Sequence, residues 1–328
     1  MLDALLNPYY LQIITFILIN AMLGISIYLT LSTGQLSLGN AGFMSVGAYT
    51  SALLTLKAGW PVYAAIPAGG VAACLSAAVI GIPATRLQGL YLAIATLGFG
   101  EVVRVIFLNL KITNGALGLS GIPSLGSIFG AGLKQLGLAD AGGLSQQQLG
   151  SLAVILLLAV LLALLLFFCL RLNASRIGRA FAAIKGDEHA AELSGVHTAR
   201  YKLLAFFLGA LVAGIAGGLA AHVTFYIGPK DFSYHRAVEI LLFAVLGGSD
   251  VVWGPVLGAV LLTLLPELLR SVAEFREMIY GSVLVLMMIF RPHGLLSQAW
   301  LTSLRQRWRK RPLPAAAAGK EAVDDANA

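Results

Sequence analysis

The chain has 328 residues, of which 58% are hydrophobic and 11% are charged. Ordinary soluble domains carry about 25% charged residues, so this composition excludes a soluble globular protein. The net charge of +7 comes from basic residues in short segments between apolar stretches. That pattern is typical of membrane topology and does not indicate a nucleic-acid-binding surface.

Apolar stretches of about 20 residues recur along the chain, and each is long enough to cross a bilayer as a helix. We predict an all-α, polytopic transmembrane bundle of about nine spans. The first has no basic residue before it, which favours a true span over a signal peptide. The approximate limits are 11–31, 39–57, 61–83, 89–109, 151–171, 203–224, 236–249, 254–270 and 277–291. The seventh is short for a crossing, which indicates a broken or re-entrant helix.

The basic residues orient these spans. With the N-terminus outside, most of the 22 Lys and Arg residues fall on the inner side, in Arg86, the segment 171–202 and the residues from Arg291 onward. Because basic loops stay in the cytoplasm, we predict an N-out, C-in topology, provided that the span count is odd. Residues 1–296 would then form the membrane domain, and 297–328 a basic to low-complexity cytoplasmic tail that contacts anionic lipid.

The longest connection, 110–150, faces the exterior in this topology. It is rich in Gly, Ser and Gln and has few charges. We expect a compact loop with one short amphipathic helix near 130–138.

Two segments combine small and polar residues. The run 34–52 contains Gln35, Ser37 and Asn40 among four glycines. Close helix packing explains such a composition, and the alternative is a discontinuous helix whose free backbone groups line a translocation route. The run 227–259 has the same character, and its glycines are expected to break a helix between residues 247 and 255.

Two acidic residues lie inside predicted spans, where charge is costly and often functional. Glu101 is three residues before Arg104, so one helix face holds both. They form either a polar lining of a pathway or a structural ion pair near the outer interface. Glu239 faces a cavity or pairs with Arg236, and the sequence leaves both alternatives open.

The segment 171–202 is the longest polar interruption between apolar blocks and holds nine charged residues. Within it, Asp187 is suited to the N-cap of a helix, Glu188 to its first turn and Gly195 to a left-handed C-terminal position. About seven helical residues remain, too few to be stable alone in water. We therefore predict a short cytoplasmic helix that docks against a partner.

Two kinds of motif are missing from the sequence. It contains no G-x-x-x-x-G-K-[ST] nucleotide loop, so ATP-driven transport would require another chain to bind the nucleotide. Its five histidines show neither paired metal-ligand spacing nor a Ser/His/Asp arrangement. We predict that the chain is not an enzyme, has no catalytic residue and binds no metal or cofactor.

Five motifs occur in the order found in bacterial branched-chain amino acid ABC permeases. They are GQLSLGNAGFMSVGAYTSALL, RLQGLYLAIATLGFGEVVR, TNGALGLSGIP, IGRAFAAIKGDEHAAELSGV and FAVLGGSDVVWGPVLGA. The chain resembles this family, and more narrowly its LivM-type subunit, from about residue 10 to 296. The third motif departs mildly from the family's glycine-rich form, through Asn114 and Ala116.

The resemblance implies a set of partners. Glu188, Ala190, Ala191 and Gly195 stand close to the family's EAA-x-x-x-G coupling pattern, with His189 inserted after the glutamate. This helix would enter a groove on a cytoplasmic ATPase, and two such subunits would hold ATP and Mg. A homologous second permease subunit would complete the pathway in the bacterial inner membrane. A periplasmic substrate-binding protein would touch the segments 110–150 and 225–236.

The resemblance also implies the function, which is import of leucine, isoleucine and valine by alternating access driven from the ATPases. A urea or short-amide permease of the same group is the alternative. A self-sufficient secondary carrier is the alternative from another class, and the docking helix argues against it. The candidate residues of the translocation path are Gln35, Ser37, Asn40, Glu101 and Glu239.

Overall fold

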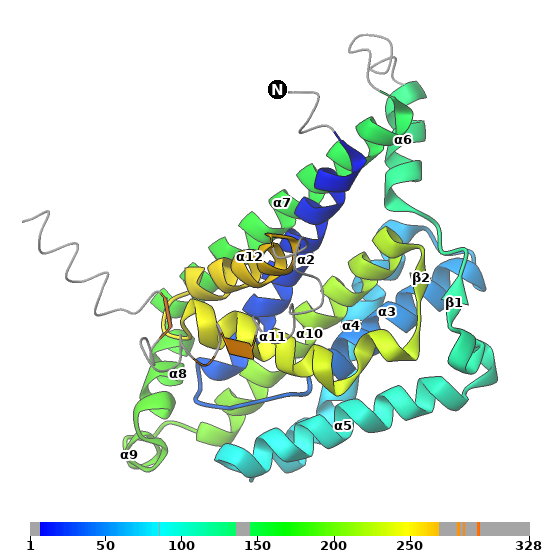
Figure 1. Cartoon of the computed structure of the whole chain (residues 1–328). Coiled ribbons are helices and arrows are strands. Elements are labelled where there is room, and N and C mark those ends of the chain that lie inside the picture. Colours follow the sequence, from blue (N-terminus) through cyan, green and yellow to red (C-terminus); the bar gives the residue numbers. More distant parts are fainter. Residues whose placement is uncertain are drawn as a thin grey trace, which may run out of the picture.

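The computed structural model describes residues 7–84, 86–135, 145–268, 281–282, 285 and 294–295. The described part is almost entirely helical, which confirms the all-α class (Figure 1). Each of the first six predicted spans corresponds to a helix. These helices are α2 (Pro8–Leu31), α3 (Asn40–Leu56), α4 (Val62–Ala84), α5 (Gly89–Asn109), α7 (Gln146–Ala174) and α10 (Thr198–Thr224).

Five of these helices, α2, α4, α5, α7 and α10, are long and apolar enough to cross a membrane. The helix α3 has 17 residues and is buried along most of its length. The seventh and eighth predicted spans are α11 (Tyr234–Gly247) and α12 (Trp253–Leu268), with 14 and 16 residues. The ninth predicted span lies mostly outside the described residues and the tail 297–328 entirely so. The span count, the orientation and the domain boundaries stay predictions.

The centre of the bundle is formed by α2, α3, α4 and α10, which pack on one another (Figure 1). Glycines bring two of these helices into backbone contact. A Cβ added to Gly47 on α3 would lie 2.1 Å from the carbonyl oxygen of Gly214 on α10. The same distance separates a Cβ on Gly217 from the carbonyl oxygen of Met44. Close packing therefore explains Gly47 of the segment 34–52, whereas Gly34 has φ 75°, the left-handed conformation of a turn.

The same segment also contains the connection between α2 and α3, where the predicted spans 11–31 and 39–57 separate. Between α2 and α3, residues 35–38 are not helical. The backbone N–H of Leu38 donates to Thr96 Oγ1 on α5 at 2.9 Å, and that of Gln35 donates to the Thr30 carbonyl at 3.2 Å. Nonhelical backbone inside a membrane protein requires such internal partners.

The connection after α5 contains the 3-10 turns η1 (Lys111–Thr113) and η2 (Gly115–Leu117), the strand β1 (Leu119–Ser120) and the helix α6 (Leu125–Gln135). The sequence predicted one helix here at 130–138, whereas α6 begins earlier and residues 136–144 are not described. β1 pairs antiparallel with β2 (Tyr226–Ile227), which follows α10, with Leu119 opposite Ile227. The turn η3 (Pro229–Phe232) then leads into α11.

A glycine-rich break separates α11 from α12, as the sequence predicted. α11 ends at Gly247, and Gly248 has φ 111°, in the region that favours glycine. A Cβ on Gly258 of α12 would lie 1.9 Å from the carbonyl oxygen of Phe243 on α11. The two short helices therefore form a close hairpin.

The polar segment 171–202 contains two helices, α8 (Arg176–Gly186) and α9 (Glu188–Leu193), of which the sequence prediction contained only the second. Ser175 caps α8, because its Oγ accepts from the N–H groups of Ile177 and Gly178. α8 buries Phe181 and Ile184. In Figure 1, α8 and α9 lie beyond one end of α7 and α6 lies at the other.

Candidate coupling helix and translocation residues

The local geometry of α9 follows the sequence prediction. Asp187 Oδ1 accepts from the N–H of Ala190 at 3.0 Å, and this bond holds the pKa of the carboxyl below its usual value. Gly195 has φ 82°, the left-handed conformation expected after the helix. The helix has six residues, too few to persist alone, and it packs against α8 and α10.

Glu188 faces the interior of the protein. Its Oε1 pairs with Nζ of Lys202 on α10, and its Oε2 accepts from Gln88 Nε2 at 3.2 Å. Lys202 is buried, with 4% of its surface exposed. Glu188 therefore ties α9 to α10 and to the residue that precedes α5.

The four predicted coupling residues divide between the interior and the surface. Ala191 is buried at 4% exposure, whereas Ala190 and Gly195 are exposed. Sequence reasoning missed Leu193, which is 91% exposed at the end of α9. The signal available in the sequence was an apolar residue two positions after Ala191 on a short polar helix. No observation tests whether these residues contact an ATPase, so that assignment stays a prediction.

The two carboxylates that lie in predicted spans both have basic partners. Arg104 Nε donates to both carboxylate oxygens of Glu101 at 2.9 Å. Arg236 Nη1 donates to Glu239 Oε2 at 2.7 Å, which is the pairing that the sequence left open. Their part in a translocation path is not tested by these contacts.

Arg236 also reaches a second helix. Its Nη2 donates to Asn20 Oδ1 on α2 at 2.6 Å. Asn20 Nδ2 in turn donates to Thr263 Oγ1 on α12 at 3.0 Å. This network links α11, α2 and α12, and sequence reasoning missed Asn20 and Thr263 because contacts between distant helices leave no local pattern.

The remaining path candidates, Gln35, Ser37 and Asn40, are all buried. Asn40 Nδ2 donates to Ser26 Oγ at 2.8 Å, and Ser37 Oγ accepts from the N–H of Gly39 at 3.3 Å. None of the three is among the residues that line the four cavities of about 170, 610, 510 and 560 Å³ in the described part of the chain. Their part in a translocation path stays a prediction.

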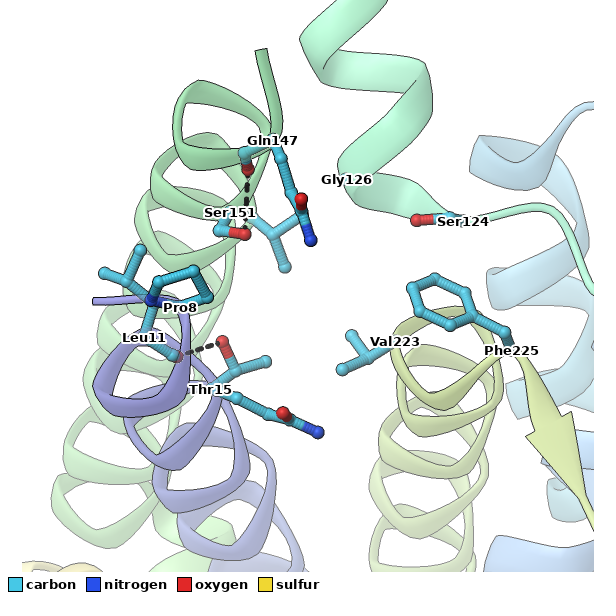
Figure 2. A pocket seen from close by; sticks show the side chains of 11 residues that line it. Pro8, Leu11, Thr15, Ser124, Gly126, Gln147, Ser151, Val223 and Phe225 are labelled. Carbon is cyan, nitrogen blue, oxygen red and sulfur yellow. Dashed lines mark hydrogen bonds between the residues drawn. The ribbon is translucent and has the colours of Figure 1, made fainter. Parts of the chain in front are cut away.

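Two cavities lie among the helices on the side of β1 and β2. Figure 2 shows one of about 170 Å³, faced by side chains of α2, α7 and α10, by Gly126 of α6, and by Ser124 and Phe225. Polar groups in this cavity are partly satisfied locally, as Thr15 Oγ1 donates to the Leu11 carbonyl at 2.8 Å. The other, of about 510 Å³, lies between α2, α10, α11 and α12 and is lined by Asn20, Asp231 and Arg236.

Within the described ranges, no group of three or more His, Cys, Asp or Glu side chains is placed to hold a metal ion. That the chain binds no metal or cofactor stays a prediction.

Comparisons with known proteins agree over most of the chain. Residues 9–291 match the family model described as the permease component of the branched-chain amino acid transport system. The high-affinity branched-chain amino acid permease protein LivM of Escherichia coli strain K12 is 38% identical over 291 residues, which are 86% of this chain and 68% of that protein. No solved structure shows a significant match.

Two other kinds of permease are more distantly similar. LivH of Escherichia coli strain K12, from the same transport system by its name, is 29% identical over 140 residues, 42% of this chain and 44% of that protein. The autoinducer 2 import permease LsrC of Salmonella typhi is 30% identical over 250 residues, 72% of this chain and 66% of that protein.

Proposed function

The chain belongs to the family of branched-chain amino acid transport permeases, and from this premise we propose that it is one permease subunit of an ATP-driven importer of leucine, isoleucine and valine. The observation that carries the proposal is the family match over residues 9–291. Because the sequence contains no nucleotide-binding loop, ATP and Mg would be held by separate ATPase subunits. The bacterial inner membrane would be its location.

The α8–α9 region is the proposed contact with an ATPase. α9 presents Ala190 and Leu193 to the surface, where a small and an apolar side chain would fit a groove. The ion pair of Glu188 with Lys202 joins the same helix to α10, which packs against α3 and α4 in the bundle centre. A displacement of α9 would therefore be transmitted to the core rather than absorbed by a loop.

The opposite end of the bundle is the proposed contact with a periplasmic binding protein. The segments 110–150 and 225–236, each predicted from the sequence to touch that protein, meet in the β1–β2 pair. Leu117, which closely precedes β1, is 81% exposed. Phe225, just before β2, and Tyr226, at its start, are also exposed. Exposed apolar side chains of this kind mark protein contact sites.

A second permease subunit completes the proposed assembly. The similarity to LivM and LivH, two permeases of one transport system by their names, supports a paralogous partner. In such an assembly, the substrate would pass between the two permease subunits. Their relative movement would open the passage alternately to each side.

Purification and reconstitution would test the function. A tag on this chain should bring down two ATPase subunits and a second permease, and proteoliposomes with the binding protein should take up leucine only with ATP. Uptake driven by a proton gradient without ATP would contradict the proposal. Urea and acetamide serve as substrate controls, and ATP-driven uptake of either in preference to leucine would overturn the substrate assignment.

A further inference from the structure

The cavity between α2, α10, α11 and α12 has a volume of about 510 Å³. Cavities that hold small molecules usually measure about 300–1,000 Å³ and combine an apolar lining with a few placed polar groups. This cavity has both features. Its polar lining includes Asn20, Asp231, Arg236 and Thr263, and its apolar lining includes Phe16, Ile19, Met44 and Phe232.

Arg236 is the basic group of the cavity. Its Nη1 donates to Glu239 and its Nη2 to Asn20, and a guanidinium carries further N–H donors beyond these two bonds. Asn20 is buried and fixed in turn by Thr263. The guanidinium is thus held in one place with donors remaining, and Arg is the side chain best suited to bind a carboxylate.

Asp231 is the acidic group of the same cavity. Its Oδ2 accepts from the N–H of Gly228 at 2.8 Å, which fixes the carboxylate at the start of η3. Its Oδ1 accepts no hydrogen bond from the part of the chain that the structure describes, and Asp231 is exposed. An acceptor of this kind suits an ammonium group.

The apolar side chains of the cavity are firmly packed. Ile19, Met44 and Phe232 are all buried, and they come from α2, α3 and η3. Such a wall favours an aliphatic side chain, because burial contributes about 0.8 kcal/mol for each CH₂ group removed from water. A cationic group, an anionic group and an apolar wall in one cavity match the three parts of an aliphatic amino acid.

We propose that this cavity is a substrate subsite within the chain, which binds the carboxylate of an aliphatic L-amino acid through Arg236, its ammonium through Asp231 and its side chain against Ile19, Met44 and Phe232. The inference rests on the proposed transport function and adds a binding step inside this subunit. An amino acid released by the binding protein would be selected a second time here.

The direct test measures binding to the detergent-purified complex without the binding protein. L-Leucine, 4-methylpentanoate (which lacks the ammonium) and L-leucinamide (which lacks the carboxylate) compete against radiolabelled L-leucine. We expect leucine to bind and each analogue to bind at least about tenfold more weakly, because each leaves one charged group of the cavity unmatched. Absence of leucine binding, or equal affinity for the three compounds, would overturn the subsite.

Conservative variants assign the two charges. Asp231→Asn keeps an acceptor for Gly228 and should reduce the preference for leucine over 4-methylpentanoate about tenfold while the preference over leucinamide stays. Arg236→Lys should reduce the preference for leucine over leucinamide while the preference over 4-methylpentanoate stays. The control is Lys230→Gln, which alters a charge beside Asp231 at an exposed position outside the cavity. The same change in both preferences in all three variants would overturn the assignment.

ATP-driven uptake by the wild-type complex separates this inference from the function on which it rests. Normal leucine uptake together with unaltered preferences in both cavity variants would refute the subsite and leave the transport function standing. Absence of leucine uptake in the wild type would refute the transport function. Size-exclusion profiles and ATP hydrolysis show whether each variant has assembled.

Discussion

Lys202 and Glu188 form an ion pair between the beginning of α10 and the first turn of α9. The side chain of Lys202 is almost fully buried, and that of Glu188 is 25% exposed. Because a buried charge without its partner is strongly unfavourable, the pair holds α9 in one position against α10. Glu188, which corresponds to the glutamate of the coupling pattern, thus holds α9 in place through a contact inside the protein.

We predict that Glu188→Gln loosens α9 and uncouples transport. Loss of the carboxylate leaves the Lys202 ammonium buried and uncompensated, which costs at the lower end of about 3–5 kcal/mol because Glu188 is partly exposed. Leucine uptake should fall at least tenfold in reconstituted complexes, while the helices of the core stay assembled. The double variant Glu188→Gln/Lys202→Met removes the orphaned charge and should recover part of the activity.

Glu192 on the same helix offers a matched control. Its Oε1 accepts from Thr198 Oγ1 at 3.2 Å, and its side chain is exposed. Glu192→Gln keeps an acceptor there and should leave uptake within about twofold of the wild type. An equal loss in the Glu188 and Glu192 variants would show that the charge of the helix matters and the buried pair does not.

We predict that Leu193→Ser weakens ATPase binding without destabilising the membrane domain. Leu193 is 91% exposed, so the protein alone loses little packing when it is truncated. Pull-down on a tag of this chain should recover at least fivefold less ATPase. Leu117→Ser, at an 81% exposed leucine in the segment 110–150 at the opposite end of the bundle, should leave that recovery unchanged. Equal ATPase recovery with Leu193→Ser would remove Leu193 from the interface.

The burial of Ala191 changes how the coupling helix should be probed. The sequence places Ala190 and Ala191 equally in the pattern, and only the structure shows that the first is exposed and the second is buried in a helix that packs against α8 and α10. A bulky charged residue at position 191 would displace α9 from its own protein. At position 190 the same residue would lie at the surface, so it would disturb the contact with the partner and leave α9 in place.

Most helices could be predicted from the sequence because the apolar stretches and their flanking signals are local. The limits of α5 agree at both ends, and the break near Gly248 follows from its glycines. The prediction lacked α8, because the charged residues of this segment made it look like a loop. Ser175 caps this amphipathic helix, and Phe181 is buried in it. The start of α6 was misplaced because the Gly-, Ser- and Gln-rich connection 110–150 carries weak local signals for where a helix begins.

The candidate site was less predictable because it depends on contacts between distant segments. Pairs on one helix, such as Arg236 with Glu239, follow from their spacing. The bond from Arg236 to Asn20 joins residues far apart in the sequence, and no local pattern encodes it. The same holds for the cavity of about 510 Å³, which several helices and turns form together.

We predict that Gly47→Ala disrupts the core of the bundle. The new Cβ would lie 2.1 Å from the Gly214 carbonyl oxygen and close to other backbone atoms of α10, so α3 and α10 would have to separate. Overpacking of this kind typically costs about 1–3 kcal/mol. Thermal unfolding of the purified complex should shift to lower temperature, and less protein should reach the membrane.

Gly98→Ala on α5 is the control for the glycine prediction. A Cβ at this position meets no atom within 4 Å, and alanine is favoured over glycine in a helix by about 1 kcal/mol. The variant should therefore be as stable as the wild type or more stable. If Gly47→Ala and Gly98→Ala unfold at the same temperature, the close approach of α3 and α10 does not limit stability.

The last prediction concerns movement of α8 relative to the turn between α11 and α12. Lys185 Nζ on α8 donates to Asp250 Oδ1 in this turn at 2.8 Å, across a groove lined by Tyr28 and Asn173. The pair is partly exposed, so it contributes no more than about 1 kcal/mol to stability. If α8 and α9 move together during transport, fixing the distance between Lys185 and Asp250 should block it.

A Lys185→Cys/Asp250→Cys variant, made after Cys74 and Cys169 are replaced by Ala, tests this movement. A short bis-maleimide should reduce leucine uptake at least tenfold, while ATPase subunits stay bound, because the linker prevents α8 from shifting against the α11–α12 turn. Each single-cysteine variant, treated with the same reagent, should keep its uptake. Unchanged uptake in the linked complex, with the link verified by mass spectrometry, would show that α8 and this turn move as one body.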